Sequence, residues 1–525
     1  MPLPPSFPSS LRPLVGNAEA LAERRDWGAA IACYERVLSA LPNDAYTLVQ
    51  LSYMESLRGA YRRAEECALA AAQTGTTDPP VLLELLPRLR TFNRVPEMLA
   101  CIESLPPAAM PIPLLIAVAA QLTYVNLPER AIEYLDEARR ADPDYPTTLL
   151  ARTQVLTYLG RFEEAEQDVK RAIRKAPEIA QGYWLQSALR RQTNENNHVV
   201  SIWRELGRPG RTADDIALLS FALHKELDDL GHYDEAWAAL RRGCVAKRSR
   251  LHYDDATNAR LFAALHSFQA DKVWEPSFRS SLTPVFIVGM HRSGTTLLEQ
   301  LLAGHSEVRA TGELYDFTSA MRHVTDHHCK GVIDETIVER AKSADFAAVG
   351  RHYLESVGWR VKGKRIITDK LPSNFLNVGF IVRALPQAKI LHMVRDPREV
   401  CFSNLRELFS DANAFSYDLG ELGAYFGRYT SLMKHWHREF EGRILDVSYA
   451  TLVSNPENEL RKVAAFCGID FEDGMINLGA RTRGVVTASA VQVRGGIRSA
   501  SRAKWMPYEK CLAPLFERLS LVRSI

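Results

Sequence analysis

The stretch FIVGMHRSGTTLLEQ, from Phe286 to Gln300, decides the fold of the C-terminal half. The apolar run that begins it has the length and composition of a buried strand, and the leucine-rich end has the spacing of a helix. Gly289 and Gly294 stand between them, five residues apart, as in loops that bind phosphates. Thr295 stands where such a loop carries its lysine. A strand, a glycine loop and a helix aim backbone N–H groups at an anion.

This loop is rich in hydrogen-bond donors. Ser293, Thr295 and Thr296 contribute hydroxyl groups, and Arg292 contributes a guanidinium that forks onto an oxyanion in place of the missing lysine. An ordinary strand-to-helix turn that happens to contain glycine is the alternative. The density of donors favours a site for a phosphate-like anion.

A second stretch, KILHMVRDPREVCFSNLREL from Lys389 to Leu408, repeats the arrangement of strand, break and helix. Arg395 would follow the carboxyl end of the strand, where ligands bind in open parallel sheets, and Ser403 comes eight residues later. This pair predicts a second phosphate site, unless Arg395 only forms an ion pair with Asp396. Together the two stretches predict a nucleotide that is phosphorylated at two places.

Composition bounds the whole chain. With 525 residues and a formal net charge of +2, we expect two domains or more and no general affinity for nucleic acid. Eight cysteines without paired spacing predict reduced thiols in a cytoplasmic protein. The proline-rich start does not read as a signal peptide. The longest apolar stretch, residues 111–125, is too short to span a membrane.

The N-terminal half contains a short repeated pattern of glycine, any residue, an aromatic, two residues and alanine. It occurs as GAYRRA (59–64), GRFEEA (160–165) and GHYDEA (231–236). Ala131 and Ala165 lie 34 residues apart, and so do Pro143 and Pro177, each of which ends a helix-like run. A 34-residue period of helix pairs with small residues at their contacts resembles the tetratricopeptide repeat.

A repeat array of this kind predicts a concave surface that captures a protein or peptide. The alternative is a scaffold that dimerises the chain or braces its second domain. The pattern decays between residues 65 and 130, where we expect degenerate repeats to continue.

The C-terminal half resembles a known family. FIVGMHRSGTTLLEQ and MVRDPREVCFS are similar to the two nucleotide motifs of the sulfotransferases, which use 3′-phosphoadenosine 5′-phosphosulfate (PAPS). Further matches are TGELYDF, TDKLPSNF and DVSYATL. With the repeats, the chain resembles the tetratricopeptide-repeat sulfotransferases, whose catalytic half is similar to tyrosylprotein sulfotransferases. The family loop usually has proline where this chain has His291.

The resemblance implies roles for the residues that match the family motifs. Arg395 and Ser403 would hold the 3′-phosphate, and Tyr449 would pack near the nucleoside. Arg494, in QVRGG, would belong to a segment that closes over the donor, where Gly496 replaces a residue that is often proline. The residues expected around the phosphosulfate are Arg292, Ser293, Gly294, Thr295 and Thr296.

The same resemblance implies a catalytic set. Glu313 matches the base that takes the acceptor's proton, with a helix-capping carboxylate after Thr311 as the alternative. Lys370 matches the lysine that stabilises the transferring group. Ser489 is our candidate for a hydroxyl near the bridging oxygen, with Thr487 as its competitor. The expected catalytic residues are Glu313, Arg292, Lys370 and Ser489.

One histidine-rich stretch, HVTDHHCK, raises the question of a metal. It places His323 and His327 four residues apart beside His328 and Cys329, a spacing that suits metal ligands on a helix. A polar helical face is the alternative. We favour the polar face and expect no metal, because arginine and lysine neutralise the donor in this family.

We therefore predict an all-α tetratricopeptide-repeat solenoid followed by an α/β P-loop-type sulfotransferase domain with a parallel central sheet. The expected bounds are 1–20 for a flexible tail, 21–270 for the solenoid and 280–525 for the sulfotransferase domain. The predicted acceptor is a protein or peptide tyrosine held by the repeats, and a homodimer is a further option. The alternatives are a glycan or small-molecule acceptor, a non-catalytic nucleotide-binding scaffold, and a kinase-like phosphotransferase that the missing lysine disfavours.

Overall fold

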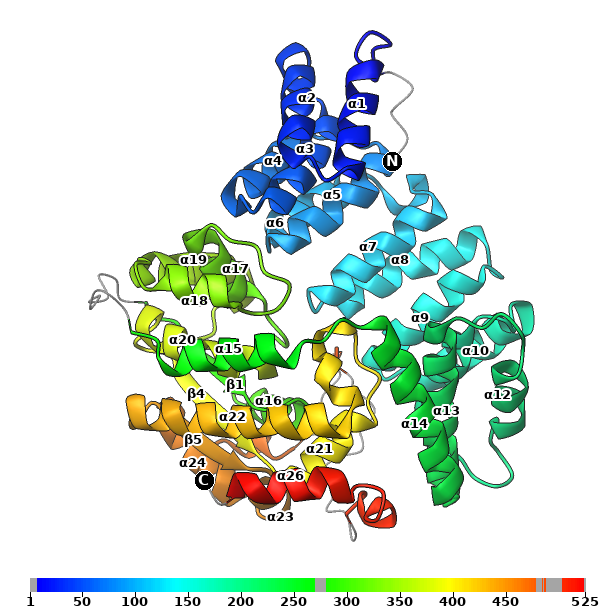
Figure 1. The fold of residues 1–525 in the computed structure, drawn as a ribbon, viewed down its shortest axis with the longest axis vertical. Coiled ribbons are helices and arrows are strands. Elements are labelled where there is room, and N and C mark those ends of the chain that lie inside the picture. The colour runs from blue at the N-terminus through cyan, green and yellow to red at the C-terminus, as the bar shows by residue number, and fades with distance from the viewer. Residues whose placement is uncertain (1–6, 270–279, 478–483, 485, 488–502, 524–525) are drawn as a thin grey trace. The chain divides into compact units, whose positions relative to one another are not determined.

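The computed structural model describes residues 7–269, 280–477, 484, 486–487 and 503–523. The chain packs as two compact units, neither of which is continuous in sequence (Figure 1). The first consists of residues 1–141, 269–278 and 315–360, and the second of residues 142–268, 279–314 and 361–525. Both units thus combine parts of the N-terminal and C-terminal halves. The domain boundaries given above stay a prediction.

The described part of the first unit is helical. Its α-helices are α1 (Arg12–Glu23), α2 (Trp27–Ala40), α3 (Ala45–Arg58), α4 (Tyr61–Gln73), α5 (Pro79–Thr91), α6 (Val95–Glu103), α7 (Ile112–Tyr124), α8 (Pro128–Ala141), α17 (Asp316–Thr325), α18 (Glu335–Ala341) and α19 (Phe346–Val361), with one 3-10 turn, η1 (Pro107–Ala109). Helix pairs α5–α6 and α7–α8 fill the region where the repeat pattern decays. Helical hairpins therefore continue through residues 65–130.

Helix α1 lies partly within residues 1–20, the segment that was expected to be a flexible tail. It begins at Arg12 with Pro13 in its first turn, where proline is tolerated because its missing N–H has no helical partner. Val15 and Ala18 are fully buried. The proline-rich composition of this segment had not suggested that a helix begins there.

The segment 315–360 packs against the first repeats, which the sequence did not predict. The Tyr61 hydroxyl lies 3.2 Å from the Ser319 hydroxyl, and the Ser319 hydroxyl donates to the Phe92 carbonyl at 3.0 Å. The Arg62 backbone N–H donates to the Asp326 carboxylate at 2.8 Å. Helix α17 is thereby tied to α4 and to the end of α5.

The second unit contains a five-stranded parallel sheet and confirms the predicted α/β fold. Its strand order is β2–β3–β1–β4–β5. The strands are β1 (Thr283–Val288), β2 (Val308–Ala310), β3 (Ile366–Asp369), β4 (Lys389–Val394) and β5 (Ile444–Ser448). The C-terminal ends of β1 and β4 lie side by side, so the two predicted phosphate-binding stretches meet at one edge of the sheet.

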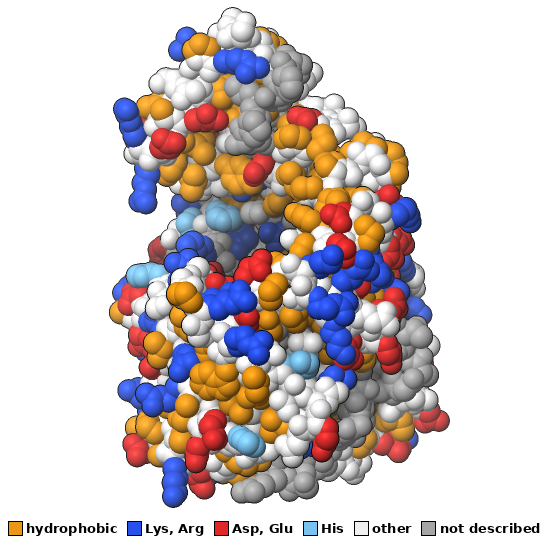
Figure 2. Space-filling view, turned by 90° about the vertical axis from the view of Figure 1, so that its right-hand side faces the viewer, with side chains coloured by type: hydrophobic (Ala, Val, Ile, Leu, Met, Phe, Trp, Pro, Cys, Tyr) orange, Lys and Arg blue, Asp and Glu red, His pale blue; other side chains and the backbone are white. Residues whose placement is uncertain are grey.

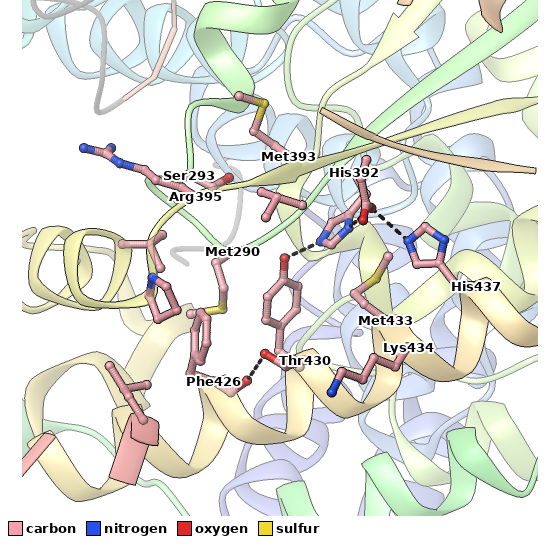
Figure 3. A pocket seen from close by; sticks show the side chains of 16 residues that line it. Met290, Ser293, His392, Met393, Arg395, Phe426, Thr430, Met433, Lys434 and His437 are labelled. Carbon is pink, nitrogen blue, oxygen red and sulfur yellow. Dashed lines mark hydrogen bonds and ion pairs between the residues drawn. The ribbon is translucent and has the colours of Figure 1, made fainter. Parts of the chain in front are cut away.

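Helices cover both faces of this sheet. Its other elements are α16 (Thr295–Leu302), η2 (Pro372–Asn377), α20 (Val378–Ala384), α21 (Pro397–Leu405), η3 (Asp411–Tyr417), α22 (Leu419–Glu439), α23 (Tyr449–Ser454), α24 (Pro456–Cys467), η4 (Asp473–Met475), η5 (Met506–Tyr508) and α26 (Ala513–Arg523). One face buries Ile287, Leu391 and Val447 against α16 and α24. The opposite face meets α22, where His392 of β4 points toward His437 (Figure 3).

The second unit also holds the helical hairpins α9 (Pro146–Leu159) with α10 (Phe162–Lys175) and α13 (Ala213–Leu230) with α14 (Tyr233–Arg250), besides α11 (Ala180–Ala188), α12 (Val199–Leu206) and α15 (Asp255–His266). The repeated sequence pattern has a local cause here and in α3–α4. Each pattern glycine ends its first helix in the left-handed conformation, with φ of 92° at Gly59, 77° at Gly160 and 81° at Gly231. The tetratricopeptide-type helical array is confirmed.

The pattern alanine has a second role, because the first helix of each hairpin bonds to its carbonyl. Ser52 donates to the Ala64 carbonyl at 2.7 Å, and Thr153 donates to the Ala165 carbonyl at 3.4 Å. In α13–α14 the Nδ1 atom of His224 lies 2.9 Å from the Ala236 carbonyl. The small alanine side chain admits this close contact between helices.

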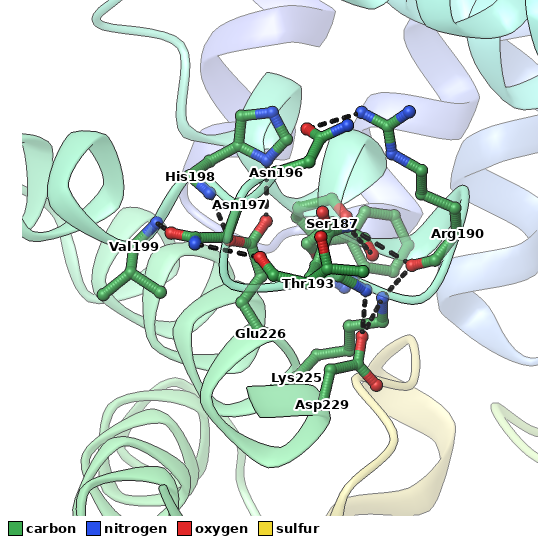
Figure 4. Close-up of polar contacts among 12 residues, drawn as sticks. Ser187, Arg190, Thr193, Asn196, Asn197, His198, Val199, Lys225, Glu226 and Asp229 are labelled. Carbon is green, nitrogen blue, oxygen red and sulfur yellow. Dashed lines mark hydrogen bonds and ion pairs between the residues drawn. The ribbon is translucent and has the colours of Figure 1, made fainter. Parts of the chain in front are cut away.

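The irregular loop between α11 and α12 is held by polar contacts with α13 (Figure 4). The His198 backbone N–H and its Nδ1 atom lie 2.6 and 2.9 Å from the two carboxylate oxygens of Glu226. The Gln192 N–H donates to Asp229 at 2.9 Å, and Lys225 donates to the Arg190 carbonyl. These contacts satisfy backbone groups that no regular structure would pair.

Charges are dispersed on the surface. Acidic and basic side chains lie intermixed on the face shown in Figure 2, in agreement with the small net charge of +2. Of the helices in the described part of the chain, none is both long and apolar enough to cross a membrane.

A buried ion pair between α9 and α10 generates a stability prediction. Arg152 and Asp168 form an ion pair with side chains 5% and 2% exposed. Arg152→Ala removes the guanidinium and leaves the Asp168 carboxylate in the core, which should cost about 3–5 kcal/mol of unfolding free energy. Denaturant unfolding followed by circular dichroism measures the loss.

The same hairpin offers a matched control. Arg161 pairs with Glu164 at 2.6 Å, but both side chains are about two-fifths exposed, at 41% and 42%. Arg161→Ala should cost less than about 1 kcal/mol because water screens the pair. Equal losses in the two variants would contradict the importance of burial.

Candidate active site

The loop between β1 and α16 has the shape of an anion cradle. Gly289, Arg292 and Gly294 have φ of 149°, 64° and 112°, and α16 begins directly afterwards at Thr295. The N–H groups of Gly289 and Ser293 donate to the carbonyls of Pro372 and Met290, and the first turn of α16 offers N–H groups that have no partner within the helix. The phosphate-type loop expected from the sequence is therefore present as a backbone shape.

The two glycines are required by close neighbours. A Cβ on Gly294 would lie 2.5 Å from a ring carbon of Tyr449, and one on Gly289 would lie 2.9 Å from the Met393 carbonyl oxygen. Tyr449, predicted to pack near the nucleoside, is thus placed against the loop by the end of β5. The loop fits closely against the ends of β4 and β5.

Hydroxyl groups line the loop. Ser293 is 1% exposed, and its Oγ has no hydrogen-bond partner among the residues that the structure describes. Thr295 and Thr296 are also buried. Thr296 Oγ1 lies 3.4 Å from Thr487 Oγ1. Thr487, which was considered as the alternative to Ser489, therefore contacts the loop. A buried hydroxyl without a partner costs free energy that a bound oxyanion would recover.

Arg292 lies in the loop, and Arg395 reaches the loop from the end of β4. Arg395 donates to the Arg292 carbonyl at 3.1 Å, and its guanidinium lies 4.3 Å from the centre of the Tyr449 ring. Ser403, expected beside Arg395, instead accepts from Arg292 Nε at 3.4 Å. Arg395 pairs with Glu399 at 3.0 Å, not with Asp396. Ser403 therefore contacts the loop arginine in this structure.

A carboxylate that the sequence reasoning missed lies beside Arg292. Glu407 Oε2 is 3.6 Å from Arg292 Nε. Burial raises the pKa of Glu407, and the guanidinium of Arg292 opposes this rise. Glu407 stands just past the end of α21, where a periodicity argument gives no reason to single it out.

Glu313 and Lys370 form a pair next to the loop. Lys370 Nζ donates to Glu313 Oε1 at 2.8 Å, with side chains 2% and 34% exposed. The two residues follow β2 and β3, which are neighbours, and the Lys370 N–H donates to the Gly312 carbonyl at 3.0 Å. The pair therefore stands at the same sheet edge as the loop.

A buried carboxylate fixes the two segments that carry this pair. Glu299 of α16 accepts from the Gly312 N–H at 2.8 Å and from the Thr368 hydroxyl at 2.7 Å. Helix α17 begins after Tyr315, whose side chain makes no capping hydrogen bond, and Glu313 itself pairs with Lys370.

Two further residues near Glu313 were not predicted to have a role. Burial lowers the pKa of His291 to about 4, with Lys370 and Arg292 also lowering it and Glu313 opposing them. Burial raises the pKa of Tyr158, and the charges of Glu313 and Glu407 raise it further. A neutral imidazole and a phenol from α9 therefore border the base candidate. The sequence did carry one signal for His291, because this residue stands where the family usually has proline.

Two predicted residues lie outside the described part of the chain. These are Ser489 and Arg494. The remaining predicted residues gather at one edge of the sheet, in the second unit. They comprise Arg292, Ser293, Gly294, Thr295, Thr296, Glu313, Lys370, Arg395, Ser403 and Tyr449.

Comparisons with known proteins agree with this geometry. Residues 284–473 match the model of the sulfotransferase family. A protein of Aquifex aeolicus (strain VF5) described as uncharacterized is 30% identical over 74% of this chain and 52% of its own length. Protein-tyrosine sulfotransferase 2 of Gallus gallus is 26% identical over 39% of this chain and 56% of its own. The chain thus spans about half the length of these relatives.

Solved structures of two kinds are similar to parts of the chain. A sulfotransferase domain from the Synechococcus PCC 7002 olefin synthase is 20% identical and covers 47% of this chain and 98% of that one, with a TM-score of 0.29. A tetratricopeptide repeat protein from Parabacteroides merdae is 13% identical and covers 46% of this chain and 92% of that one, with a TM-score of 0.34.

The close fit of the loop generates a prediction on its glycine. Gly294→Ala combines an unfavourable left-handed conformation with a collision against Tyr449. Gly231→Ala shares the conformational penalty, with φ of 81°, but nothing lies within 4 Å of a Cβ built at that position. Thermal unfolding should show a clearly larger loss for Gly294→Ala than for Gly231→Ala. Equal losses would mean that the loop can move away from Tyr449.

Proposed function

We propose that this chain, whose residues 284–473 match the model of the sulfotransferase family, moves a sulfuryl group from PAPS to an acceptor hydroxyl. The observation that carries the proposal is the Glu313–Lys370 pair at 2.8 Å beside the glycine loop. Beside the loop, the carboxylate can accept a proton from the acceptor hydroxyl, and the ammonium group can stabilise negative charge on the transferring group.

The residues of the loop fit the phosphosulfate end of this donor. The N–H groups at the start of α16 are suited to oxyanions, and the Ser293 hydroxyl, which has no partner among the described residues, donates one more hydrogen bond. Arg292 and Arg395 bring two positive charges. Glu407 and Glu399 orient these guanidiniums through ion pairs.

For the 3′-phosphate we assign Arg395 and Ser403. Arg395 lies at the carboxyl end of β4, over the Tyr449 ring, and its fork suits a phosphate. Ser403 accepts a hydrogen bond from Arg292, the residue whose carbonyl accepts from Arg395. A site for the 3′-phosphate would let the protein distinguish PAPS from ATP. The loop also has no lysine at the position where kinase-like phosphotransferases carry one, which disfavours a kinase reaction.

The side chains of the protein are assigned two tasks, which are to position the reacting groups and to stabilise their charges. Glu313 takes the proton of the acceptor hydroxyl while the acceptor oxygen bonds to sulfur and the bond from sulfur to the phosphate oxygen breaks. Lys370 holds the carboxylate of Glu313 in place and offsets the negative charge on the transferring group. PAPS supplies the activated sulfuryl group. Such an in-line transfer depends mainly on orientation and electrostatics.

A tyrosine of a protein or peptide is the acceptor we propose. The protein-tyrosine sulfotransferases among the relatives support this choice, and the helical repeats offer a surface suited to a peptide chain. A glycan, a small-molecule hydroxyl and a scaffold without turnover remain the rivals that the experiments below separate. We also propose a cytoplasmic location, since all eight cysteines are free thiols. Homodimerisation stays a prediction.

The donor assignment is tested by binding. The protein should bind adenosine 3′,5′-bisphosphate far more tightly than ADP, because only the former carries a 3′-phosphate. Arg395→Ala should cost about 2–4 kcal/mol of binding free energy for the bisphosphate and little for ADP. Titration calorimetry measures both ligands.

Arg398→Ala is the matched control, three residues further along the chain in the first turn of α21. Its guanidinium packs over Trp505 and Phe516 and has no assigned phosphate role. It should leave the preference for the bisphosphate intact. Equal affinities of the unaltered chain for the two nucleotides would remove the 3′-phosphate site from the proposal.

The base assignment is tested by Glu313→Gln, which keeps size and hydrogen bonding but removes the proton acceptor. Transfer should slow by about 10²–10⁴-fold, while bisphosphate affinity stays nearly unchanged. Glu307→Gln is the control, since Glu307 only pairs with Arg365 at the surface. If Glu313→Gln kept the full transfer rate, the base would have to be another residue. If the unaltered chain bound the donor normally but transferred nothing, a non-catalytic nucleotide-binding scaffold would be favoured.

A further inference from the structure

A cluster that the proposed reaction does not use lies under the sheet. His392 of β4 and Asp446 of β5 are direct partners across the parallel pairing, so their side chains leave the same face. Helix α22 covers this face, and His437 in its last turn points toward the same place (Figure 3). Three residues far apart in sequence are brought together by strand register and by one helix.

Their ligand atoms converge closely. Asp446 Oδ1 lies 2.7 Å from His392 Nδ1 and 2.8 Å from His437 Nε2. One ligand atom from each residue lies within 4.8 Å of the others. Two imidazole nitrogens and one carboxylate oxygen are a donor set that zinc and related divalent transition metals prefer.

The orientation of His392 is fixed by a further contact. Its Nε2 lies 2.5 Å from the hydroxyl of Tyr429, which is buried on α22. Histidines that bind metals usually bond through their second nitrogen to a polar group, which fixes the ring. Here Tyr429 holds His392 so that Nδ1 faces the carboxylate.

The cluster is open to solvent and borders a pocket of about 360 Å³. The side chains of Asp446 and His437 are 56% and 34% exposed, so an ion can enter without unfolding. The pocket wall is mostly apolar, with Met433 and Phe426 among its residues. In Figure 3 the ammonium of Lys434 points away from the three ligands, so it does not occupy the site.

A second candidate cluster is less suited to a cation. Glu65, His323 and His352 also come together in the first unit. However, Arg94 Nε donates to Glu65 at 2.7 Å, which places a positive charge in the cluster. His327, predicted as a partner of His323, instead lies 2.8 Å from Asp334. His327, His328 and Cys329 lie beyond the end of α17 at Thr325, so the stretch HVTDHHCK forms neither the metal pair on a helix nor the polar helical face that the sequence suggested.

We propose that His392, His437 and Asp446 bind one divalent transition-metal ion of the zinc class. The three side chains supply three ligands, and the side facing the pocket leaves a position for water or a small ligand. This site is distinct from the Glu313–Lys370 pair, and the proposed sulfuryl transfer has no step at it. This proposal departs from the sequence-based expectation of no metal, which rested on the neutralisation of the donor by arginine and lysine.

Metal binding to the full chain tests this proposal without an activity assay. The purified protein is treated with chelator, dialysed against zinc chloride or cobalt chloride, and its metal content is measured by mass spectrometry. One equivalent should bind, and bound cobalt should give the visible absorption of a low-coordinate site. His437→Ala and Asp446→Asn should each weaken binding by at least about 100-fold, since even groups that only orient a ligand cost 10–100-fold.

His352→Ala is the matched control, because it removes one histidine from the other cluster. It should keep the bound equivalent and the cobalt spectrum. Circular dichroism confirms that each variant is folded. Unchanged binding in both His437→Ala and Asp446→Asn, loss of the metal in His352→Ala alone, or no stoichiometric metal in the unaltered chain would each overturn the proposal.

Discussion

The close approach of one loop to two strand ends is the constraint on which the site depends. Gly294 faces the ring of Tyr449 and Gly289 faces the Met393 carbonyl, at distances that leave no room for a side chain. The loop is therefore pressed into a tight turn in which Gly289, Arg292 and Gly294 have positive φ. The same packing buries Ser293, whose Oγ has no hydrogen-bond partner among the described residues. A bound oxyanion would recover the free energy that this hydroxyl costs.

The parallel register extends this constraint to the rest of the site. Because β2, β3, β1 and β4 all run in the same direction, the segments after them meet at one edge. Glu299, in the helix that the loop begins, bonds to the segments after β2 and β3 and so links the anion loop to the Glu313–Lys370 pair. One short helix thereby positions both halves of the proposed reaction.

Local sequence signals predicted much of this architecture. Strand, loop and helix around Gly289, the strand before Arg395, and the glycine-ended repeats follow from periodicity and from left-handed glycine, which act over a few residues. Contacts between distant segments were beyond such signals. Examples are the pairing of Ser403 with Arg292, the packing of α17 on α4, and the meeting of His392 with Asp446. Each depends on tertiary packing, which no single stretch encodes.

We propose above that this chain transfers a sulfuryl group to a tyrosine oxygen. The most direct measurement incubates the purified chain with PAPS radiolabelled at sulfur and a tyrosine-containing peptide, beside the same peptide with phenylalanine in place of tyrosine. The account predicts label on the tyrosine peptide alone, with fragmentation placing the sulfate on the phenol oxygen. Label on both peptides, or no label although the bisphosphate binds, would contradict it.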